Sequence, residues 1–188
     1  MRQEFSYYYG NDYNDAYRIN LPFNVSVGNN KYVNIQGIID TGASAFTSTA
    51  YALGIQLSEQ EFVNKYKLKP IARTGINSSA PVIYYRYIVD EIRLGKFNFR
   101  NFPVFITFNK SVTVTLVGMS FLRLFNISIK PEYKTILFEA NEELKTRWKN
   151  NQGFNNIDKV NIETFIDFGL EEDIGILEAN RIYKLSSE

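Results

Sequence analysis

The sequence predicts an all-β fold, either a sandwich or a barrel assembled from many short strands. Ile19, Leu21, Phe23, Val25 and Val27 alternate with mostly polar neighbours, which is the period-two pattern of a strand with one buried face. Aromatic residues make up 15% of the chain, chiefly Tyr and Phe, and their rings pack well on pleated surfaces. Short apolar runs separated by turn residues recur along the chain, as they do in all-β domains.

The expected strands begin with a hairpin. Its first strand covers residues 19–27, and the turn Gly28-Asn29-Asn30 leads to a second strand over 33–40. Enrichment in β-branched and aromatic residues, or renewed alternation, predicts the remaining strands. These are expected at residues 82–89, 92–94, 97–99, 102–108, 112–116, 127–129 and 136–138.

Helices are expected to be few and short. Residues 58–66 are predicted to be helical because Ser58 opens a capping box, and 118–125 are expected to form one or two helical turns. Farther along, Asn141 is a suitable N-cap, and a further helix is expected near 161–168.

The distribution of charge divides the chain. Residues 1–140 carry 15 basic and 10 acidic groups, whereas 141–188 carry 6 and 10. The main body is therefore mildly basic and the C-terminal part acidic. We expect a lead-in over 1–17, one domain over 18–140, and a partly helical C-terminal appendage over 141–188.

The absence of two residue types restricts the possible chemistry. The chain has no Cys, which excludes disulfides, thiol catalysis and Cys-ligated metals. It also has no His, which excludes Ser-His-Asp and Cys-His catalysis and His-ligated zinc. A hydrolase of this composition must use carboxylates or an oxygen-ligated metal for its chemistry.

Composition also bears on partners and location. The net charge of +1 gives no general indication of a nucleic-acid or membrane partner. No stretch approaches the roughly 18 continuous apolar residues of a membrane span, and the N-terminus lacks the pattern of a signal peptide. We therefore expect a soluble, cytoplasmic protein that binds neither nucleic acid nor membrane.

The segment that indicates chemistry is Ile38-Ile39-Asp40-Thr41-Gly42-Ala43-Ser44. An apolar strand runs directly into an acid, and burying an acid costs free energy unless it is hydrogen-bonded or protonated. Gly42 permits a tight turn whose backbone groups can approach that carboxylate. An isolated Asp-Thr-Gly more often marks an ordinary surface turn, since Asp and Gly are common turn residues.

Two further segments give Asp40 a context. Leu116-Val117-Gly118 follows another expected strand and precedes a short helix, and the small, polar stretch 74–79 lies between it and Asp40. This order resembles the retropepsin-like aspartic peptidases, in which the aspartate loop, a flap hairpin and an apolar-apolar-Gly segment follow one another. The resemblance covers roughly residues 18–140. It implies that the all-β domain is a closed, retropepsin-like β-barrel with short helices.

The resemblance also implies roles for individual residues. Asp40 matches the catalytic aspartate. Thr41, Gly42 and Ala43 match the rest of the active-site loop, where the Thr41 hydroxyl would tie the two loops of a dimer together. The segment that matches the support beneath this loop is Val117-Gly118. The residues that match the flap are Thr74, Gly75, Ile76 and Asn77.

The chain contains one Asp-Thr-Gly, whereas the mechanism of the family uses two aspartates. The resemblance therefore implies a symmetric homodimer in which Asp40 of each copy meets its counterpart at the two-fold axis. Two adjacent carboxylates share one proton, so one can accept a proton from water while the other polarises the peptide carbonyl. The expected partners are a second copy of the chain and an extended polypeptide substrate, and no metal or other cofactor is expected.

Two other functions stay open on the sequence. One is a peptide-binding or assembly module that keeps the fold without proteolysis, although a binding module has no need to bury an acid. The other is an unrelated all-β interaction domain with a chance motif, in which Asp40 would lie on an exposed surface turn.

Overall fold

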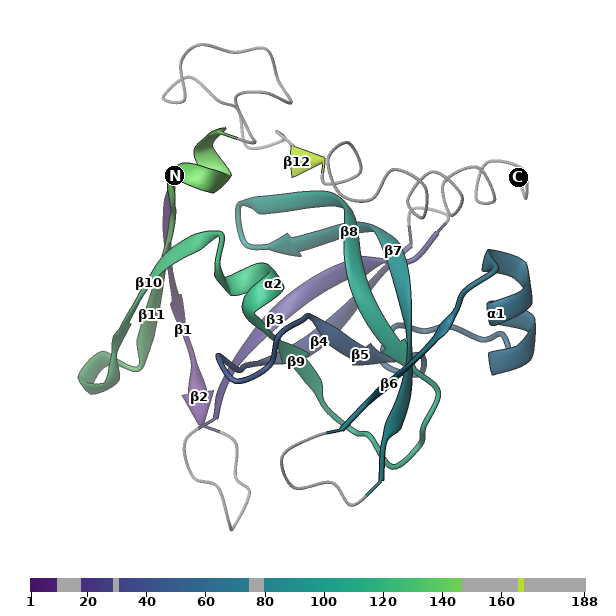
Figure 1. Cartoon of the computed structure of the whole chain (residues 1–188). Helices are drawn as coiled ribbons and strands as arrows, with labels where there is room; N and C mark the ends of the chain where they lie inside the picture. Colours follow the sequence, from purple (N-terminus) through teal and green to yellow (C-terminus); the bar gives the residue numbers. More distant parts are fainter. Residues whose placement is uncertain (10–17, 29–30, 75–79, 147–165, 168–188) are drawn as a thin grey trace.

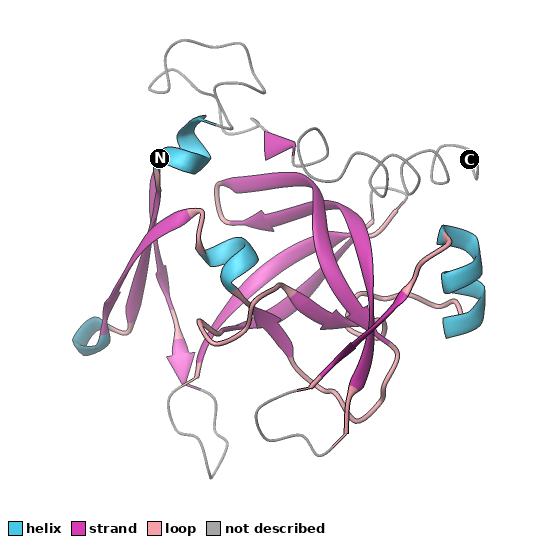
Figure 2. Ribbon diagram, viewed as in Figure 1, coloured by secondary structure: helices cyan, strands magenta, loops and turns pink. Residues whose placement is uncertain are grey.

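Figure 1 shows the computed structural model of the chain, which describes residues 1–9, 18–28, 31–74, 80–146 and 166–167. Most of these residues form strands, and the few helices are short (Figure 2). The all-β prediction is confirmed. None of the described helices is both long enough and apolar enough to cross a lipid bilayer.

The predicted first hairpin consists of β3 (Ile19–Ser26) and β4 (Tyr32–Ile39), which pair in antiparallel register. Leu21, Phe23 and Val25 of β3 are completely buried, whereas Pro22 and Asn24, which lie between them, are exposed. The period of two in the sequence is therefore the period of burial in the structure.

Further strands close this hairpin into a barrel. They are β5 (Thr47–Thr49), β7 (Val82–Leu94), β8 (Phe97–Thr107) and β9 (Thr115–Val117). Neighbouring strands follow the order β8-β5-β9-β4-β3-β7, and β7 pairs with β8, which completes the ring. The short β6 (Pro70–Arg73) pairs with the first part of β7 and extends the sheet. The expectation of a closed, retropepsin-like barrel is confirmed.

The sequence predicted β7 and β8 as two shorter strands each, with β7 interrupted at Asp90-Glu91. In the structure both strands are continuous and pair along most of their length. Glu91 is only 6% exposed, and it forms ion pairs with Arg93 and, at 3.9 Å, with Arg100. A buried acid is tolerated in a strand when it is paired in this way, so the strand need not end there.

The helices α1 (Glu59–Tyr66) and α2 (Met119–Leu122) connect strands of the barrel and the second sheet. α1 begins with the predicted capping box, in which the Ser58 side chain accepts from the Glu61 amide and the Glu61 carboxylate accepts from the Ser58 amide. α2 is the short helix expected after Gly118. Both predictions are confirmed.

A second sheet lies beside the barrel, at the left of Figure 1. It has the order β1-β11-β10, formed by β1 (Arg2–Ser6), β11 (Thr135–Ala140) and β10 (Phe125–Lys130). The turn η1 (Pro131–Tyr133) joins β10 to β11. β2 (Tyr8–Tyr9) pairs with the start of β3 and so continues the chain from this sheet to the barrel. The N-terminal lead-in gave no strand signal, so β1 and β2 were not predicted.

One aromatic cluster joins the barrel, α2 and the second sheet. Its centre is Phe121, which is completely buried. Centroid distances of 5.1 to 6.1 Å separate the Phe121 ring from those of Phe23, Phe46, Phe99, Phe102 and Phe125. Phe125 in turn packs edge-on against Phe138 of β11 at 5.1 Å. Because α2 also contacts the candidate site, this cluster fixes the site to the core.

The C-terminal part is described only in two pieces. Asn141 Oδ1 accepts a hydrogen bond from the Leu144 amide at 3.0 Å, and a helix starts at Glu142, as Asn141 predicted. β12 (Ile166–Asp167) pairs in parallel with β8, so the helix expected over 161–168 is wrong for these two residues. The remainder of that expected helix lies outside the described residues.

Candidate active site

β4 carries Asp40 to the end of a buried strand pair. Ile38 and Ile39 pair in parallel with Leu116 and Val117 of β9. The amide of Asp40 then donates to the carbonyl of Val117 at 3.1 Å, so the backbone ladder extends to Asp40 itself. The two sequence segments that suggested a site are therefore adjacent, and Asp40 is half-buried at their common end.

The turn after Asp40 fixes the carboxylate. Asp40 Oδ1 accepts a hydrogen bond from the Gly42 amide at 2.8 Å, and the Asp40 carbonyl accepts one from the Ala43 amide at 3.2 Å. An ionised carboxylate bonded to a backbone amide is held more firmly than a neutral acceptor would be. Among the described residues, no group donates to Oδ2. Thr41 and Gly42 are exposed, so the loop presents its tip outward.

Gly118 allows the Val117-Gly118 segment to pack closely against the active-site loop. A Cβ atom at this position would lie 2.4 Å from the carbonyl oxygen of Ala45 and 2.5 Å from that of Ala43. Both obstacles are backbone atoms, which cannot turn away as a side chain can. A residue without a side chain is therefore required at position 118 for this packing.

The first turn of α2 bonds directly to the active-site loop. The Met119 amide donates to the Ala43 carbonyl at 2.8 Å, and the Ser120 amide donates to the Ser44 carbonyl at 3.0 Å. The first amides of a helix have no acceptor within the helix, and the loop carbonyls supply acceptors here. The Ser120 hydroxyl accepts from the Phe46 amide at 3.0 Å, which fixes the end of the loop as well.

Gly37 is a second glycine on which the site depends, and the sequence interpretation did not include it. It lies inside β4 and is buried. A Cβ atom there would lie 2.6 Å from Val117 Cγ2 and 3.0 Å from the ring of Phe23. A glycine within an otherwise regular strand pattern is a signal of close packing and could have indicated this position.

Arg73 joins strand β6 to the active-site loop by a hydrogen bond. It is the last residue of β6 and lies opposite Val82 of β7. Its Nη1 donates to Ser44 Oγ at 3.0 Å, and its guanidinium carbon lies 3.8 Å from the centroid of the Phe105 ring. Nothing in the local sequence predicted these contacts, because the three residues belong to separate segments.

The expected flap is only partly described. Thr74, which directly follows β6, is exposed. Gly75, Ile76 and Asn77 lie outside the described residues. The strands on either side of the expected flap, β6 and β7, are described, and they pair antiparallel as the two strands of a hairpin do.

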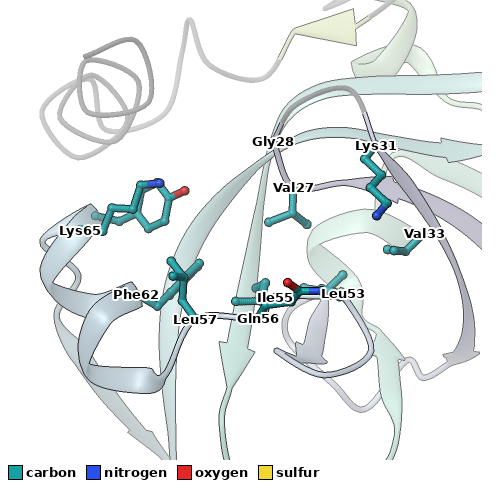
Figure 3. Close-up of a pocket in the computed structure, with 12 residues that line it drawn as sticks. Val27, Gly28, Lys31, Val33, Leu53, Ile55, Gln56, Leu57, Phe62 and Lys65 are labelled. Atoms are coloured by element: carbon teal, nitrogen blue, oxygen red, sulfur yellow. The ribbon is translucent and has the colours of Figure 1, made fainter. Parts of the chain in front are cut away.

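A cavity of about 430 Å³ lies at the opposite end of β4 (Figure 3). Its lining includes Lys31 and Val33, near the start of the strand, and Phe62 and Lys65 of α1. A strand rises about 3.3 Å per residue, so Val33 and Asp40 are roughly 23 Å apart. This cavity is therefore separate from the loop that carries Asp40.

No group of three acidic, His or Cys side chains among the described residues is arranged to hold a metal ion. Asp40 is the carboxylate that the described loop presents, and it accepts a hydrogen bond from the backbone amide of Gly42. In this part of the chain the arrangement is suited to acid-base chemistry by a carboxylate.

A closed barrel whose strand ends in Asp-Thr-Gly, supported from below by an apolar-Gly segment and a short helix, is the structure of a retropepsin-like aspartic protease. A profile of the family described as "Aspartyl protease" matches residues 23–121, which is more than half of the chain. The chain belongs to this aspartyl protease family.

A solved structure with a similar fold supports this assignment. A retropepsin-like aspartic protease from Rickettsia conorii is 22% identical, with a TM-score of 0.50, and the match covers 73% of this chain and 91% of that one. The EIAV protease complexed with the inhibitor HBY-793 is 17% identical over 60% of this chain and 91% of that one. Its TM-score of 0.37 is too low to support a conclusion. Among curated proteins, none matches this sequence significantly.

Proposed function

We propose that the protein is an aspartic endopeptidase that hydrolyses peptide bonds through a water molecule activated by two Asp40 residues of a homodimer. The observation that carries this proposal is the Asp40 loop. Its carboxylate is bonded through Oδ1 to the Gly42 amide, half-buried, and placed at the end of a barrel strand. A carboxylate held in this way is oriented before any substrate arrives.

The proposal requires a second copy of the chain. The sequence contains one Asp-Thr-Gly, and a water-activating pair needs two carboxylates. Thr41 and Gly42 are exposed at the loop tip, which supports an arrangement in which the loops of two copies meet. In that dimer, the Thr41 hydroxyl would reach the loop of the partner, as the family resemblance implies.

The proposed mechanism follows from the properties of two adjacent acids. Two carboxylates at close range cannot both ionise readily, so they share one proton. The ionised member accepts a proton from water, and that water attacks the peptide carbonyl, which the protonated member polarises. The tetrahedral intermediate then collapses as the carboxyl that took the proton from water donates it to the amine nitrogen, and the peptide bond breaks. This step forms no covalent enzyme intermediate.

The proposed substrate is an extended polypeptide. The β6–β7 hairpin contacts the active-site loop through the Arg73–Ser44 hydrogen bond, so a peptide bound at the loop would lie beside the hairpin. An extended peptide at such a place can form strand-like hydrogen bonds with backbone groups. We place the enzyme in the cytoplasm as part of this proposal, and fractionation of the producing cells would test that location.

The test is cleavage of a broad peptide library by the purified chain across acidic to neutral pH. We expect cleavage that pepstatin inhibits and that Asp40→Asn abolishes. We also expect specific activity to rise with protein concentration as dimers form. A stable dimer that binds peptides without cleaving any of them would favour the non-proteolytic module instead.

A further inference from the structure

Arg73 lies where strand β6 and the active-site loop are in contact. Its guanidinium donates from Nη1 to Ser44 Oγ at 3.0 Å, and Ser44 is four residues after Asp40 in the same loop. The face of the guanidinium lies over the Phe105 ring at 3.8 Å. Phe105 is itself adjacent to the loop, because its amide donates to the Phe46 carbonyl at 2.9 Å.

Within the described residues, these contacts hold Arg73 but use only part of its hydrogen-bonding capacity. A guanidinium has about five N–H donors in a fixed plane, and Ser44 takes one of them. Within the part of the chain that the structure describes, Arg73 forms no ion pair with a carboxylate. By contrast, Arg93 and Arg100 of the same barrel both face the buried Glu91.

We propose that Arg73 binds the carboxylate of an Asp or Glu side chain in the peptide substrate, close to the scissile bond. This inference rests on the proposed function, since it assigns a residue preference to the same proposed peptide site. Stacking on Phe105 and bonding to Ser44 fix the plane of the guanidinium beforehand, so little side-chain freedom remains to be lost on binding. The two parallel bonds that arginine forms with a carboxylate supply the selectivity.

The geometry favours a carboxylate over other groups. Arg73 is half-buried against an aromatic ring, where a charge pair is screened less than on an open surface. Ser44 is exposed next to it, and its hydroxyl, which accepts from Arg73, can still donate its own hydrogen to an acceptor on the same ligand. A neutral amide at the same place would still accept from the guanidinium, but it has one acceptor oxygen in place of two and no charge to attract the arginine.

The test uses pairs of peptides that differ only by Glu or Gln at one position within four residues of the scissile bond. We expect the wild-type dimer to cleave one Glu peptide at least about tenfold better than its Gln partner, which corresponds to one charge-assisted contact. Arg73→Gln is expected to bring the ratio of kcat/KM for the Glu and Gln peptides from about tenfold to about one, chiefly by raising KM for the Glu peptide, whatever loss both peptides share. Arg73→Lys should keep part of the preference.

The matched control is Lys31→Gln, which removes one positive charge at the far end of β4 and should leave the preference unchanged. If Arg73→Gln lowers kcat/KM equally for both peptides, Arg73 only braces the hairpin and the proposal is wrong. The proposal is equally wrong if the wild-type enzyme shows no Glu preference at any position.

A binding assay separates failure of this inference from failure of the proposed function. If the wild-type chain cleaves no peptide, the protease proposal fails, and the same peptide pairs are then tested for binding to Asp40→Asn by fluorescence anisotropy. Tighter binding of a Glu peptide, lost in the Asp40→Asn, Arg73→Gln double variant, would still support Arg73 as the acidic-residue site. Equal affinities, or no binding, would overturn it.

Discussion

The hydroxyl of Ser120 accepts a hydrogen bond from the backbone amide of Phe46 at 3.0 Å. This bond joins α2 to the segment that leads out of the active-site loop. Phe46 is completely buried, so its amide has no access to water if the hydroxyl is removed. The Asp40 loop is therefore held at its start by Val117 and at its end by Ser120.

Ser120→Ala should lower both stability and activity. Leaving the buried Phe46 amide without an acceptor costs about 1–3 kcal/mol of unfolding free energy. Urea unfolding measures this loss, and peptide cleavage should fall with it as the loop becomes less well positioned. Ser128→Ala, at an exposed position of β10, is the control and should change neither quantity. Equal effects of the two substitutions would contradict the role of the Ser120 bond.

Gly118→Ala should destabilise the chain strongly. The new Cβ would lie 2.4 Å from the Ala45 carbonyl oxygen, and the backbone would have to move to make room. We expect a loss of about 3 kcal/mol or more, at the upper end for overpacking, together with loss of activity. Thermal unfolding is the measurement, and a variant as stable as the wild type would show that the loop can shift freely.

Gly37→Ala should also destabilise, but here the obstacle can be removed. The new Cβ would lie 2.6 Å from Val117 Cγ2, a side-chain atom. The double variant Gly37→Ala, Val117→Ala should therefore be more stable than the sum of the two single losses predicts, by about 1 kcal/mol. A double-mutant cycle in urea measures this coupling. Strict additivity would show that the Phe23 ring, not Val117, is the obstacle.

Leu144→Ala should destabilise the domain although it lies in the expected appendage. Leu144 is only 1% exposed and belongs to the aromatic and aliphatic core. Removing a buried leucine side chain costs about 2–4 kcal/mol. Glu142→Ala, in the same helical turn but exposed, is the control, and its ion pair with Lys145 contributes little. A negligible effect of Leu144→Ala would show that this turn does not contribute to domain stability.

Glu4 should make stability depend on acidic pH. Hydrogen bonds from Lys130 and Thr135 lower the pKa of Glu4 from its ordinary value of 4.5. A carboxylate with a lowered pKa stabilises the folded state above its unfolded pKa, and this contribution is lost as pH falls through the folded value. Unfolding temperatures measured from pH 6 down to pH 3 should fall less steeply in Glu4→Gln than in the wild type.

The control for this pH dependence is Glu132→Gln, in the exposed turn η1, which should leave the slope unchanged. If Glu4→Gln has the same slope as the wild type, the bonds of Glu4 across the second sheet contribute no measurable stability. The effect should also weaken at high salt, since all three side chains are at the surface.

Local patterns predicted those parts of the fold that are decided locally. Alternation predicted β3 and β4, and the capping box at Ser58 predicted α1. Both patterns consist of residues close in sequence, so they can be recognised without knowing the fold. The strand expected over 112–116 begins only at Thr115, where the Ser48 hydroxyl lies within 2.8 Å of the Thr115 hydroxyl. That partner belongs to β5, a strand too short to give a pattern of its own.

Some residues of the candidate site were likewise predicted from the sequence and others were not. Asp40, Gly42 and Gly118 were predicted because each belongs to a short contiguous motif, Asp40-Thr41-Gly42 or Leu116-Val117-Gly118, on which the family resemblance rests. Arg73 and Ser120 were not, since their bonds to Ser44 and Phe46 depend on how distant segments pack. No periodicity or motif in one segment can indicate which residue of another segment will contact it.

The pairing of β1 with β11 has a consequence for the order in which the protein can fold. Ala140 donates its amide hydrogen to the carbonyl of Met1 at 2.9 Å, and Arg2 lies opposite Glu139. During synthesis the first strand emerges long before its partner, so it stays unpaired until the final hairpin of this sheet has left the ribosome. Contacts between such distant segments slow folding. An unpaired strand edge also invites association with other chains, so nascent and partly folded molecules are the stage at which aggregation is expected.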